Sequence, residues 1–238
     1  MGKSINIILF CSVFIFFILF GCGASTNDLA QEISVIQQTT TYSRATGGTH
    51  IFGDSIFATL NHRIKNLLEN KTGKQIADHS ESGKWASEIK NQYIHFRSQK
   101  PEIVIMDGGG NDALGNGSNC KSFNEKCKAV VKNAAQMLKD TFDMMAQDGV
   151  KYIFFLGTHY PRGWNNGYDV AVDYGYTLIE PLCRDSAVPC KLIDPREKLN
   201  TTANVLEWDG VHPNNLGTEI LADMIYEDLP LFTIQTAR

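Results

Sequence analysis

One short segment of this 238-residue chain restricts its fold more than any other. Residues 103–106 are apolar and mostly β-branched, and they are followed at once by Asp107, three glycines and Asn111. Such a run is typical of a strand that is buried on both faces of a parallel sheet and ends in a turn. Open parallel α/β sheets bind ligands outside the carboxyl ends of their strands. A tight turn explains the glycines but not the amide, so we expect Asn111 to lie in a binding site.

Strand-like and helix-like segments alternate along the rest of the chain. This order predicts right-handed βαβ crossovers, and hence a parallel sheet of about five strands with helices on both faces. No internal repeat is present, and the length suits one domain at residues 48–238. We expect strands at 50–52, 74–77, 103–106, 152–156 and 191–193, and helices at 57–70, 84–97, 122–147, 171–182 and 215–226.

Two further motifs supply the groups of a serine nucleophile and its base. Gly53-Asp54-Ser55 follows the first predicted strand, and Asp209 stands three residues before His212 near the end of the chain. A serine hydroxyl is a poor nucleophile at neutral pH, so it needs an imidazole that removes its proton and a carboxylate that orients the imidazole. Ser55, His212 and Asp209 fit these roles. Either motif alone could equally be a turn or a helix N-cap.

The motifs together resemble the GDSL-type SGNH hydrolases, a family of serine esterases and lipases. The first block of the family is matched by Gly53-Asp54-Ser55-Ile56, with Ile56 in place of leucine. The third block is matched by Gly109-Gly110-Asn111-Asp112 and the fifth by Asp209-Gly210-Val211-His212. The lone glycine of the second block is placed at Gly83. The resemblance covers roughly residues 48–227 and implies a flavodoxin-like three-layer α/β/α sandwich.

The resemblance also implies a mechanism that uses no cofactor and no metal ion. Ser55 would attack an ester carbonyl and form an acyl enzyme, with His212 as the base and Asp209 as its orienting carboxylate. The backbone N–H groups of Ser55 and Gly83 and the side-chain amide of Asn111 would form the oxyanion hole. We therefore expect a carboxylic-ester hydrolase whose substrate is an acylated glycan, a lipid or a small ester.

Two other interpretations of the same residues stay open. An O-acyltransferase would use this apparatus to pass an acyl group to a glycan hydroxyl instead of water. A surface lipoprotein could keep the fold and bind a ligand without catalysis, although such a binder has no need of Ser55, Asn111, Asp209 and His212 together.

Other polar and aromatic residues compete for a place in the site. His159 follows the fourth predicted strand and could contact a substrate, but no carboxylate accompanies it at short spacing, and an ordinary loop histidine is the simpler interpretation. Asp54 and Asp112 more simply brace their turns through backbone hydrogen bonds. Aromatic residues between 160 and 176 could form the rim of a sugar or acyl site, or could pack against the helix below.

The N-terminal residues are expected to be an export signal rather than part of the fold. Lys3 precedes an apolar stretch at residues 5–20. These 16 residues would span about 24 Å as a helix, less than the roughly 30 Å hydrocarbon core of a bilayer, which favours a signal peptide at 1–21 over a spanning helix. The segment Leu19–Cys22 resembles a bacterial lipobox, which implies that Cys22 is lipidated. An ordinary secretory signal is the alternative.

The predicted anchor sets the expected location of the protein. Lipidation of Cys22 would hold the domain at a membrane of the bacterial cell envelope, with the outer membrane favoured, and the polar residues 22–47 would be a flexible tether. Without lipidation, the protein would be periplasmic or secreted.

Charge and cysteine spacing narrow the partners further. The chain has 22 basic and 26 acidic side chains and no basic cluster, so it is a poor candidate for binding nucleic acid. Cys120 and Cys127, like Cys183 and Cys190, are separated by six residues, whereas zinc ligand pairs usually lie about two to four residues apart. An exported chain also meets an oxidising compartment, in which disulfides form. We therefore expect two disulfides, Cys120–Cys127 and Cys183–Cys190, rather than a metal site.

Overall fold

The structure is a computed structural model that describes residues 48–115, 120–165 and 167–233. The predicted signal peptide (1–21), the predicted lipidation site Cys22 and the predicted tether (22–47) lie outside the described residues. The described part of the chain forms one compact unit.

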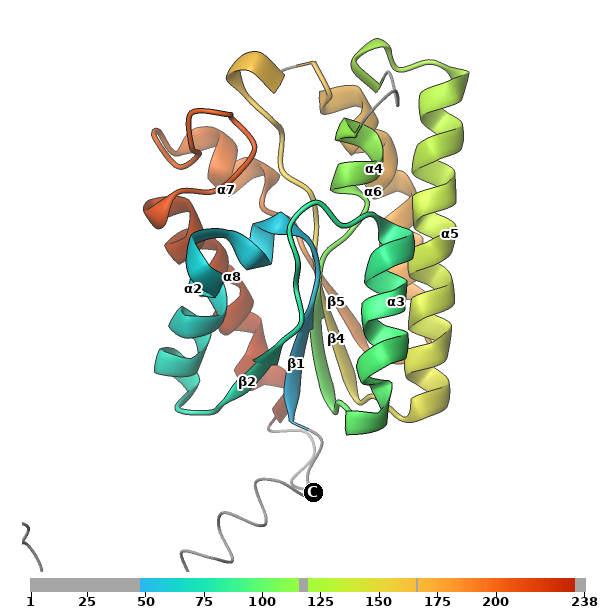
Figure 1. Ribbon diagram of the computed structural model, residues 1–238, viewed down its shortest axis with the longest axis vertical. Coiled ribbons are helices and arrows are strands. Elements are labelled where there is room, and N and C mark those ends of the chain that lie inside the picture. The colour runs from blue at the N-terminus through green and yellow to red at the C-terminus, as the bar shows by residue number, and fades with distance from the viewer. Residues whose placement is uncertain (1–47, 116–119, 166, 234–238) are drawn as a thin grey trace, which may run out of the picture. The chain divides into compact units, whose positions relative to one another are not determined.

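A five-stranded parallel sheet lies at the centre of this unit (Figure 1). The strand order is β2-β1-β3-β4-β5, which is the flavodoxin-like order. The register pairs Phe52 with Met106 and Met106 with Phe155, so three adjacent strands finish at one level. The strands are β1 (Thr49–Phe52), β2 (Ile76–Asp78), β3 (Ile103–Met106), β4 (Tyr152–Leu156) and β5 (Cys190–Ile193).

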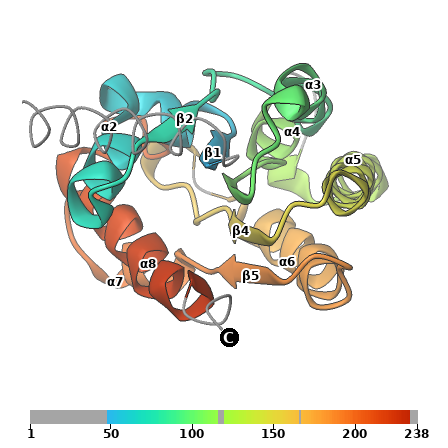
Figure 2. The same cartoon turned by 90° about the horizontal axis from the view of Figure 1, so that it is seen from below.

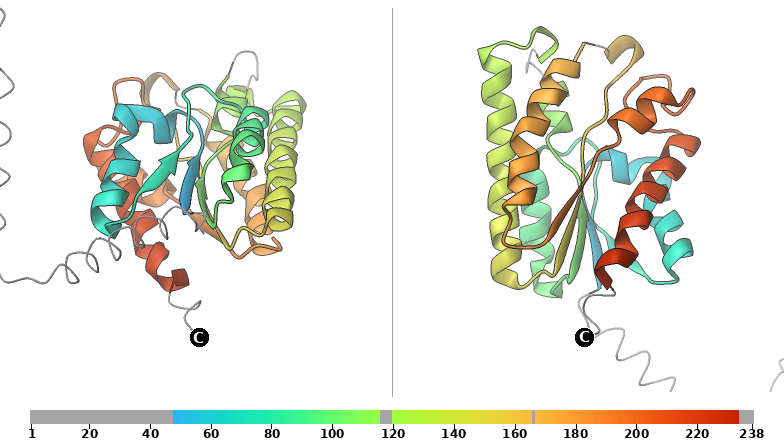
Figure 3. Two further views of the ribbon diagram at one scale, coloured as in Figure 1. Left: turned by 60° about the horizontal axis from the view of Figure 1, so that its bottom comes forward. Right: turned by 180° about the vertical axis from the view of Figure 1, so that it is seen from behind.

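Helices cover both faces of the sheet, as the views in Figures 2 and 3 show. Successive residues of a strand point to opposite faces, and β3 accordingly contributes to two cores. Val104 and Met106 pack beneath the helices of one face, and Ile105 packs beneath those of the other. The three-layer α/β/α prediction is therefore confirmed. One face carries α3 (Ala86–Phe96), α5 (Glu125–Asp148) and α6 (Asp169–Arg184), and the other carries α2 (Ser55–Thr72) and α8 (Asn215–Thr233).

The predicted helices and strands are all present, and the differences are at their ends. Helix α2 begins at Ser55 rather than 57 because the Asp54 side chain accepts a hydrogen bond from the Ile56 N–H and caps it. Two short helices, α4 (Gly110–Leu114) and α7 (Arg196–Thr201), are missing from the prediction. Helices this short show no clear 3.6-residue periodicity.

Both predicted disulfides are present. Cys120–Cys127 and Cys183–Cys190 join Cα atoms that lie 4.9 and 5.1 Å apart. The first links the turn before α5 to its first turn, and the second links the end of α6 to β5. Within the part of the chain that the structure describes, no helix is both long and apolar enough to cross a bilayer, and no cluster of side chains suits a metal ion.

Candidate active site

The three predicted catalytic residues meet at the carboxyl edge of the sheet. Ser55 is the first residue of α2, three residues beyond the end of β1, and it is buried. Asp209 and His212 lie in the loop between α7 and α8. The crossovers of a parallel sheet bring such distant segments to one edge, and here they bring together side chains that are 157 residues apart.

A continuous line of hydrogen bonds joins the three side chains. The Ser55 hydroxyl lies 2.8 Å from His212 Nε2, and His212 Nδ1 lies 2.6 Å from Asp209 Oδ2. The carboxylate cannot donate, so Nδ1–H is the donor to Asp209, and Nε2 is left with a lone pair that accepts from the hydroxyl. This is the tautomer that a general base needs in order to take the proton of Ser55.

The carboxylate of Asp209 is fixed by its own loop. Its Oδ1 accepts from the backbone N–H groups of Val211 and His212, at 2.9 and 3.0 Å. Partial burial alone would raise the pKa of Asp209, but the hydrogen bonds from the His212 side chain and from these two N–H groups hold that pKa below its ordinary value. Asp209 is therefore ionised at neutral pH and can stabilise an imidazolium.

A glycine allows this loop to pack closely against the neighbouring one. Gly210 has φ +70, and a Cβ there would lie 1.9 Å from the carbonyl oxygen of Arg162. The Arg162 N–H donates to the Gly210 carbonyl at 2.8 Å, and the Asn165 side chain donates to the Asp209 carbonyl at 3.0 Å. Any other residue at 210 would push the loop, and with it Asp209 and His212, away from Ser55.

The Asn111 side chain lines the same pocket as Ser55, but both of its N–H groups are already engaged. Nδ2 donates to Asp54 Oδ2 at 3.1 Å and to the Lys84 carbonyl at 3.0 Å. A developing oxyanion is a stronger acceptor than a neutral peptide carbonyl. It would therefore compete best for the N–H that now points to Lys84, while the bond to Asp54 holds the amide in place.

Gly83 lies in the turn before α3 that also supplies the Lys84 carbonyl. It is exposed, with φ +77, and the Glu81 N–H in the same turn donates to the Gly53 carbonyl at 3.1 Å. The turn is thus attached both to the segment before Ser55 and to Asn111. The role of the Gly83 N–H in the oxyanion hole stays a prediction.

Two residues that the sequence motifs do not reveal hold the segment directly before Ser55. Gln92 in α3 accepts from the Gly53 N–H and donates to the Gly53 carbonyl, both at 3.0 Å. Asp107 accepts from the Asp54 N–H at 2.9 Å. A Cβ at Gly53 would lie 2.3 Å from Asp107 Oδ1, so glycine is required for this close approach. A carboxylate between a buried strand and a glycine turn was the one signal that could have pointed to Asp107.

His159 is a buried neutral histidine rather than a second base. Burial lowers its pKa to about 4, and its ring donates to the Val211 carbonyl. Its Nε2 has no hydrogen-bond partner among the described residues. His159 therefore supports the loop of Asp209 and His212 through Val211, in agreement with the simpler interpretation of a loop histidine.

Residues 41–225 match the GDSL-like Lipase/Acylhydrolase family. The chain belongs to this family. No curated protein matches the chain.

Several solved structures share the fold of this chain. A lipase/acylhydrolase from Enterococcus faecalis is 14% identical, with a TM-score of 0.59 over 76% of this chain and 94% of that chain. An acetylxylan esterase from Geobacillus stearothermophilus is 19% identical, with a TM-score of 0.59 over 76% and 92%. An α/β hydrolase from the metagenome of Lake Arreo, Spain, is 17% identical, with a TM-score of 0.60 over 76% and 93%. At these identities the likeness shows the fold alone.

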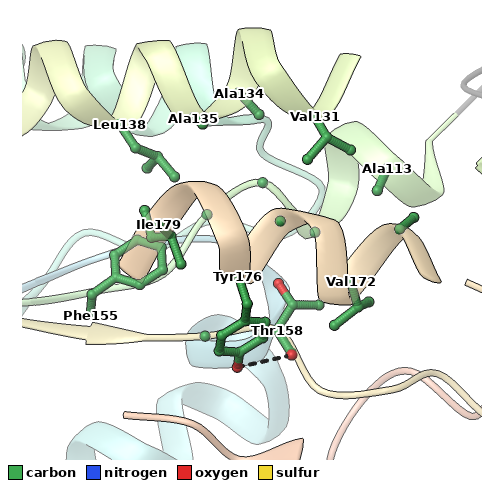
Figure 4. A pocket seen from close by; sticks show the side chains of 16 residues that line it. Ala113, Val131, Ala134, Ala135, Leu138, Phe155, Thr158, Val172, Tyr176 and Ile179 are labelled. Carbon is green, nitrogen blue, oxygen red and sulfur yellow. Dashed lines mark hydrogen bonds between the residues drawn. The ribbon is translucent and has the colours of Figure 1, made fainter. Parts of the chain in front are cut away.

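Two small cavities adjoin the site of this GDSL-like hydrolase. One of about 30 Å³ is lined by Ser55, Asn111 and His159, among others. The other, of about 60 Å³, lies between α5, α6 and the glycine turn, with an apolar lining that includes Leu138, Phe155 and Ile179 (Figure 4). The two share Gly108, Gly110, Gly157 and Thr158 in their walls. The turn after β3 thus separates the cavity that Ser55 lines from the larger apolar cavity.

Four of the five aromatic residues predicted for a rim pack against the domain instead, and the side chain of the fifth, Trp164, lies outside the described part of the structure. The Tyr176 ring is buried, its hydroxyl donates to the Thr158 carbonyl at 3.2 Å, and the Arg196 guanidinium lies 3.5 Å from its ring centroid. Tyr160 donates to Asp173 at 2.6 Å. Tyr168 and Tyr174 pack against the small core beside Cys120 and Cys127. The packing interpretation holds for these four tyrosines.

Proposed function

We propose that this GDSL-like hydrolase cleaves carboxylic esters through an acyl enzyme formed on Ser55. One observation carries the proposal: the Ser55 hydroxyl, the His212 imidazole and the Asp209 carboxylate form an unbroken hydrogen-bonded line of 2.8 and 2.6 Å. A structural serine has no need of an imidazole in the base tautomer together with a carboxylate whose pKa is held low.

The reaction follows from the positions of the protons. His212 Nε2 takes the hydroxyl proton as Ser55 Oγ bonds to the ester carbonyl carbon, and Asp209 stabilises the resulting imidazolium. The tetrahedral intermediate collapses when His212 returns the proton to the leaving alkoxide. Water then adds to the acyl enzyme with His212 again as the base, and Ser55 leaves with the proton. The Ser55 and Gly83 N–H groups and the Asn111 amide are the proposed oxyanion donors.

We propose that the acyl group is short. The cavity that Ser55 lines is about 30 Å³, and the one behind the glycine turn is about 60 Å³, whereas an apolar cavity of roughly 150 Å³ is needed to hold a benzene ring. The acetylxylan esterase among the structural relatives makes acetylated xylo-oligosaccharides a suitable natural test ester. Initial rates on p-nitrophenyl esters of two to twelve carbons measure the chain length directly. A rate that rises toward the longest chains would exclude a short-acyl site.

The test of the serine mechanism is Ser55→Ala with p-nitrophenyl acetate as substrate. Turnover should fall to the level of the residual background, while the melting temperature stays near that of the wild type, because only the nucleophile is lost. Ser98→Ala is the matched control, since Ser98 is an exposed serine in the 3₁₀ turn Arg97–Gln99. Substantial turnover in folded Ser55→Ala would exclude this mechanism.

We also propose that the protein is an exported lipoprotein anchored through Cys22. The support is the apolar stretch at 5–20 followed by Gly21 and Cys22. Palmitate labelling in a bacterial host should tag the wild type and fail with Cys22→Ser, whereas Cys11→Ser, within the predicted signal peptide, should still be labelled. An unlabelled wild type would exclude the anchor and leave the esterase proposal unaffected.

A further inference from the structure

Two aspartates lie buried side by side directly behind the nucleophile. Asp54 is 4% exposed and Asp107 is 5% exposed, and the Asp54 backbone N–H donates to Asp107 Oδ1 at 2.9 Å. Asp54 precedes Ser55 in the chain, and Asp107 follows β3. Neither takes part in the proton transfers of the proposed mechanism. Two neighbouring buried carboxylates repel each other strongly, so their presence here requires an explanation.

The hydrogen bonds of the four carboxyl oxygens locate a proton. Asp54 Oδ1 accepts from the Ile56 N–H at 2.9 Å and Asp54 Oδ2 from the Asn111 amide at 3.1 Å. Asp107 Oδ1 accepts from the Asp54 N–H at 2.9 Å. Asp107 Oδ2 faces no N–H or O–H donor within the described part of the chain. Of the four oxygens, Asp107 Oδ2 is thus the one that accepts no hydrogen bond, so it is the one that can carry a proton and act as a donor.

The surroundings favour keeping that proton. Burial, and then the charge of Asp54, raise the pKa of Asp107 well above its ordinary value. Burial also raises the pKa of Asp54, against the hydrogen bonds it accepts and the influence of His212. The other titratable groups that face the pair are Asp78, at the end of β2, and Asp112, in α4, and both add negative charge. His159, which lines the same pocket, is neutral above about pH 4.

We propose that Asp54 and Asp107 share a single proton, and that this pair is a positioning device for the Asn111 amide and the first turn of α2. The inference rests on the proposed esterase function. With one proton, the pair carries a single negative charge, and Asp54 can cap α2 and hold one Asn111 N–H while the other remains available for an oxyanion. Without the proton, two repelling carboxylates would lie beneath Asn111. Asp107 acts through Asp54 and does not touch the substrate.

The test compares two substitutions of Asp107 over pH 6 to 10 with p-nitrophenyl acetate. Asp107→Asn copies the protonated acid, since its oxygen can accept from the Asp54 N–H and its NH₂ can donate to the Asp54 carboxyl. It should retain kcat within about threefold at pH 7. Asp107→Val removes both bonds, so kcat should fall by about 10- to 100-fold with KM little changed, because the amide positioned for the transition state is released.

The pH profile separates positioning by a shared proton from a merely structural role. Wild-type kcat should fall at alkaline pH as the pair loses its proton, and Asp107→Asn should lack this fall. Asp112→Asn is the control: it changes another buried aspartate, whose side chain accepts from the Ala86 N–H, and should keep the alkaline fall. The infrared band of a protonated carboxyl group should be present in the wild type and lost in Asp107→Asn.

Either of two results would overturn the proposal. The first is an equal loss of kcat in Asp107→Asn and Asp107→Val with both variants folded, which would mean that a charged Asp107 is required. The second is an unchanged alkaline fall in Asp107→Asn. If Asp107→Val does not fold, the dependence of kcat on pH in Asp107→Asn still tests whether the pair shares a proton. Failure of the esterase proposal itself appears separately, as turnover that survives in Ser55→Ala.

Discussion

The two sides of Ser55 are built in different ways. On one side, Asp209 and His212 are three residues apart in a single loop, and their side chains are 26% and 34% exposed. On the other side, Asn111, Asp54 and Asp107 are buried or half-buried, and their contacts join residues that are 27 to 57 positions apart in the sequence. The side that holds Asp209 and His212, called the base side below, is a local and partly solvated motif. The side that holds Asn111, called the oxyanion side below, depends on the packing of three segments, which follow β1, precede α3 and follow β3.

This difference has an energetic consequence. Hydrogen bonds around His212 can exchange with water, so a substitution there should remove a chemical step and leave stability almost unchanged. The Asp54 carboxylate that accepts from Asn111 is buried, so the loss of this donor leaves an unsatisfied buried group at a cost of about 1–3 kcal/mol. Substitutions on the oxyanion side should therefore affect both catalysis and stability.

The largest effect should come from the base side. His212→Ala removes the group that accepts the Ser55 proton, so kcat on p-nitrophenyl acetate should fall by about 10⁴- to 10⁶-fold. The melting temperature should stay near that of the wild type. His95→Ala, an exposed histidine of α3, is the control. A loss of less than tenfold in folded His212→Ala would mean that another group serves as the base.

Asp209→Asn should cause the next largest loss of kcat. The substitution keeps the shape of the side chain but lets it donate to His212 Nδ1, which favours the wrong imidazole tautomer, and a loss in kcat of about 10³- to 10⁴-fold is expected. Thermal unfolding provides the check on folding. Were kcat unchanged, His212 would have to be oriented by something other than this carboxylate.

Asn111→Ala tests the oxyanion side. Loss of one oxyanion donor should lower kcat by about 10²- to 10³-fold, or about 2.7 to 4 kcal/mol, with little change in KM. Because Asp54 and Lys84 also lose a donor, the melting temperature should fall as well, unlike that of His212→Ala. If the loss of kcat merely follows the fraction unfolded, Asn111 closes the turn and is not an oxyanion donor.

The smallest effect concerns stability against pH. The folded-state pKa of Asp107 is raised, so its contribution to stability is fully present below the unfolded pKa near 4 and is lost as the pH rises through the folded pKa. Asp107→Asn does not titrate. Relative to the wild type, its melting temperature should therefore rise between pH 4 and pH 8, by about 2–4 °C for each kcal/mol. A constant difference across this range would mean that Asp107 is ionised in the folded protein.

The sequence motifs predicted the residues on the base side of the site but missed residues on the oxyanion side. Ser55, Asp209 and His212 stand in short motifs whose spacing predicts their roles, and the structure brings them within hydrogen-bonding distance. Sheet, strand number and layers followed from alternating patterns. Gln92 and Asp107 act through contacts 39 and 53 residues apart. No local pattern encodes such contacts, because they arise only once helix α3 and strands β1 and β3 have packed together.

The position of α8 has a consequence for how the protein is made. Strands β1 to β5 can pair as the chain emerges, since each new strand joins a neighbour that precedes it, and synthesis delivers the N-terminal part first. The helix that packs on α2 and covers Ile51, Ile105 and Phe154 comes last, directly after the loop of His212. Until it arrives, the nascent polypeptide has an uncovered apolar face and no base for Ser55. The covering of this apolar face and the placing of the proposed base beside Ser55 thus belong to the same late step of folding.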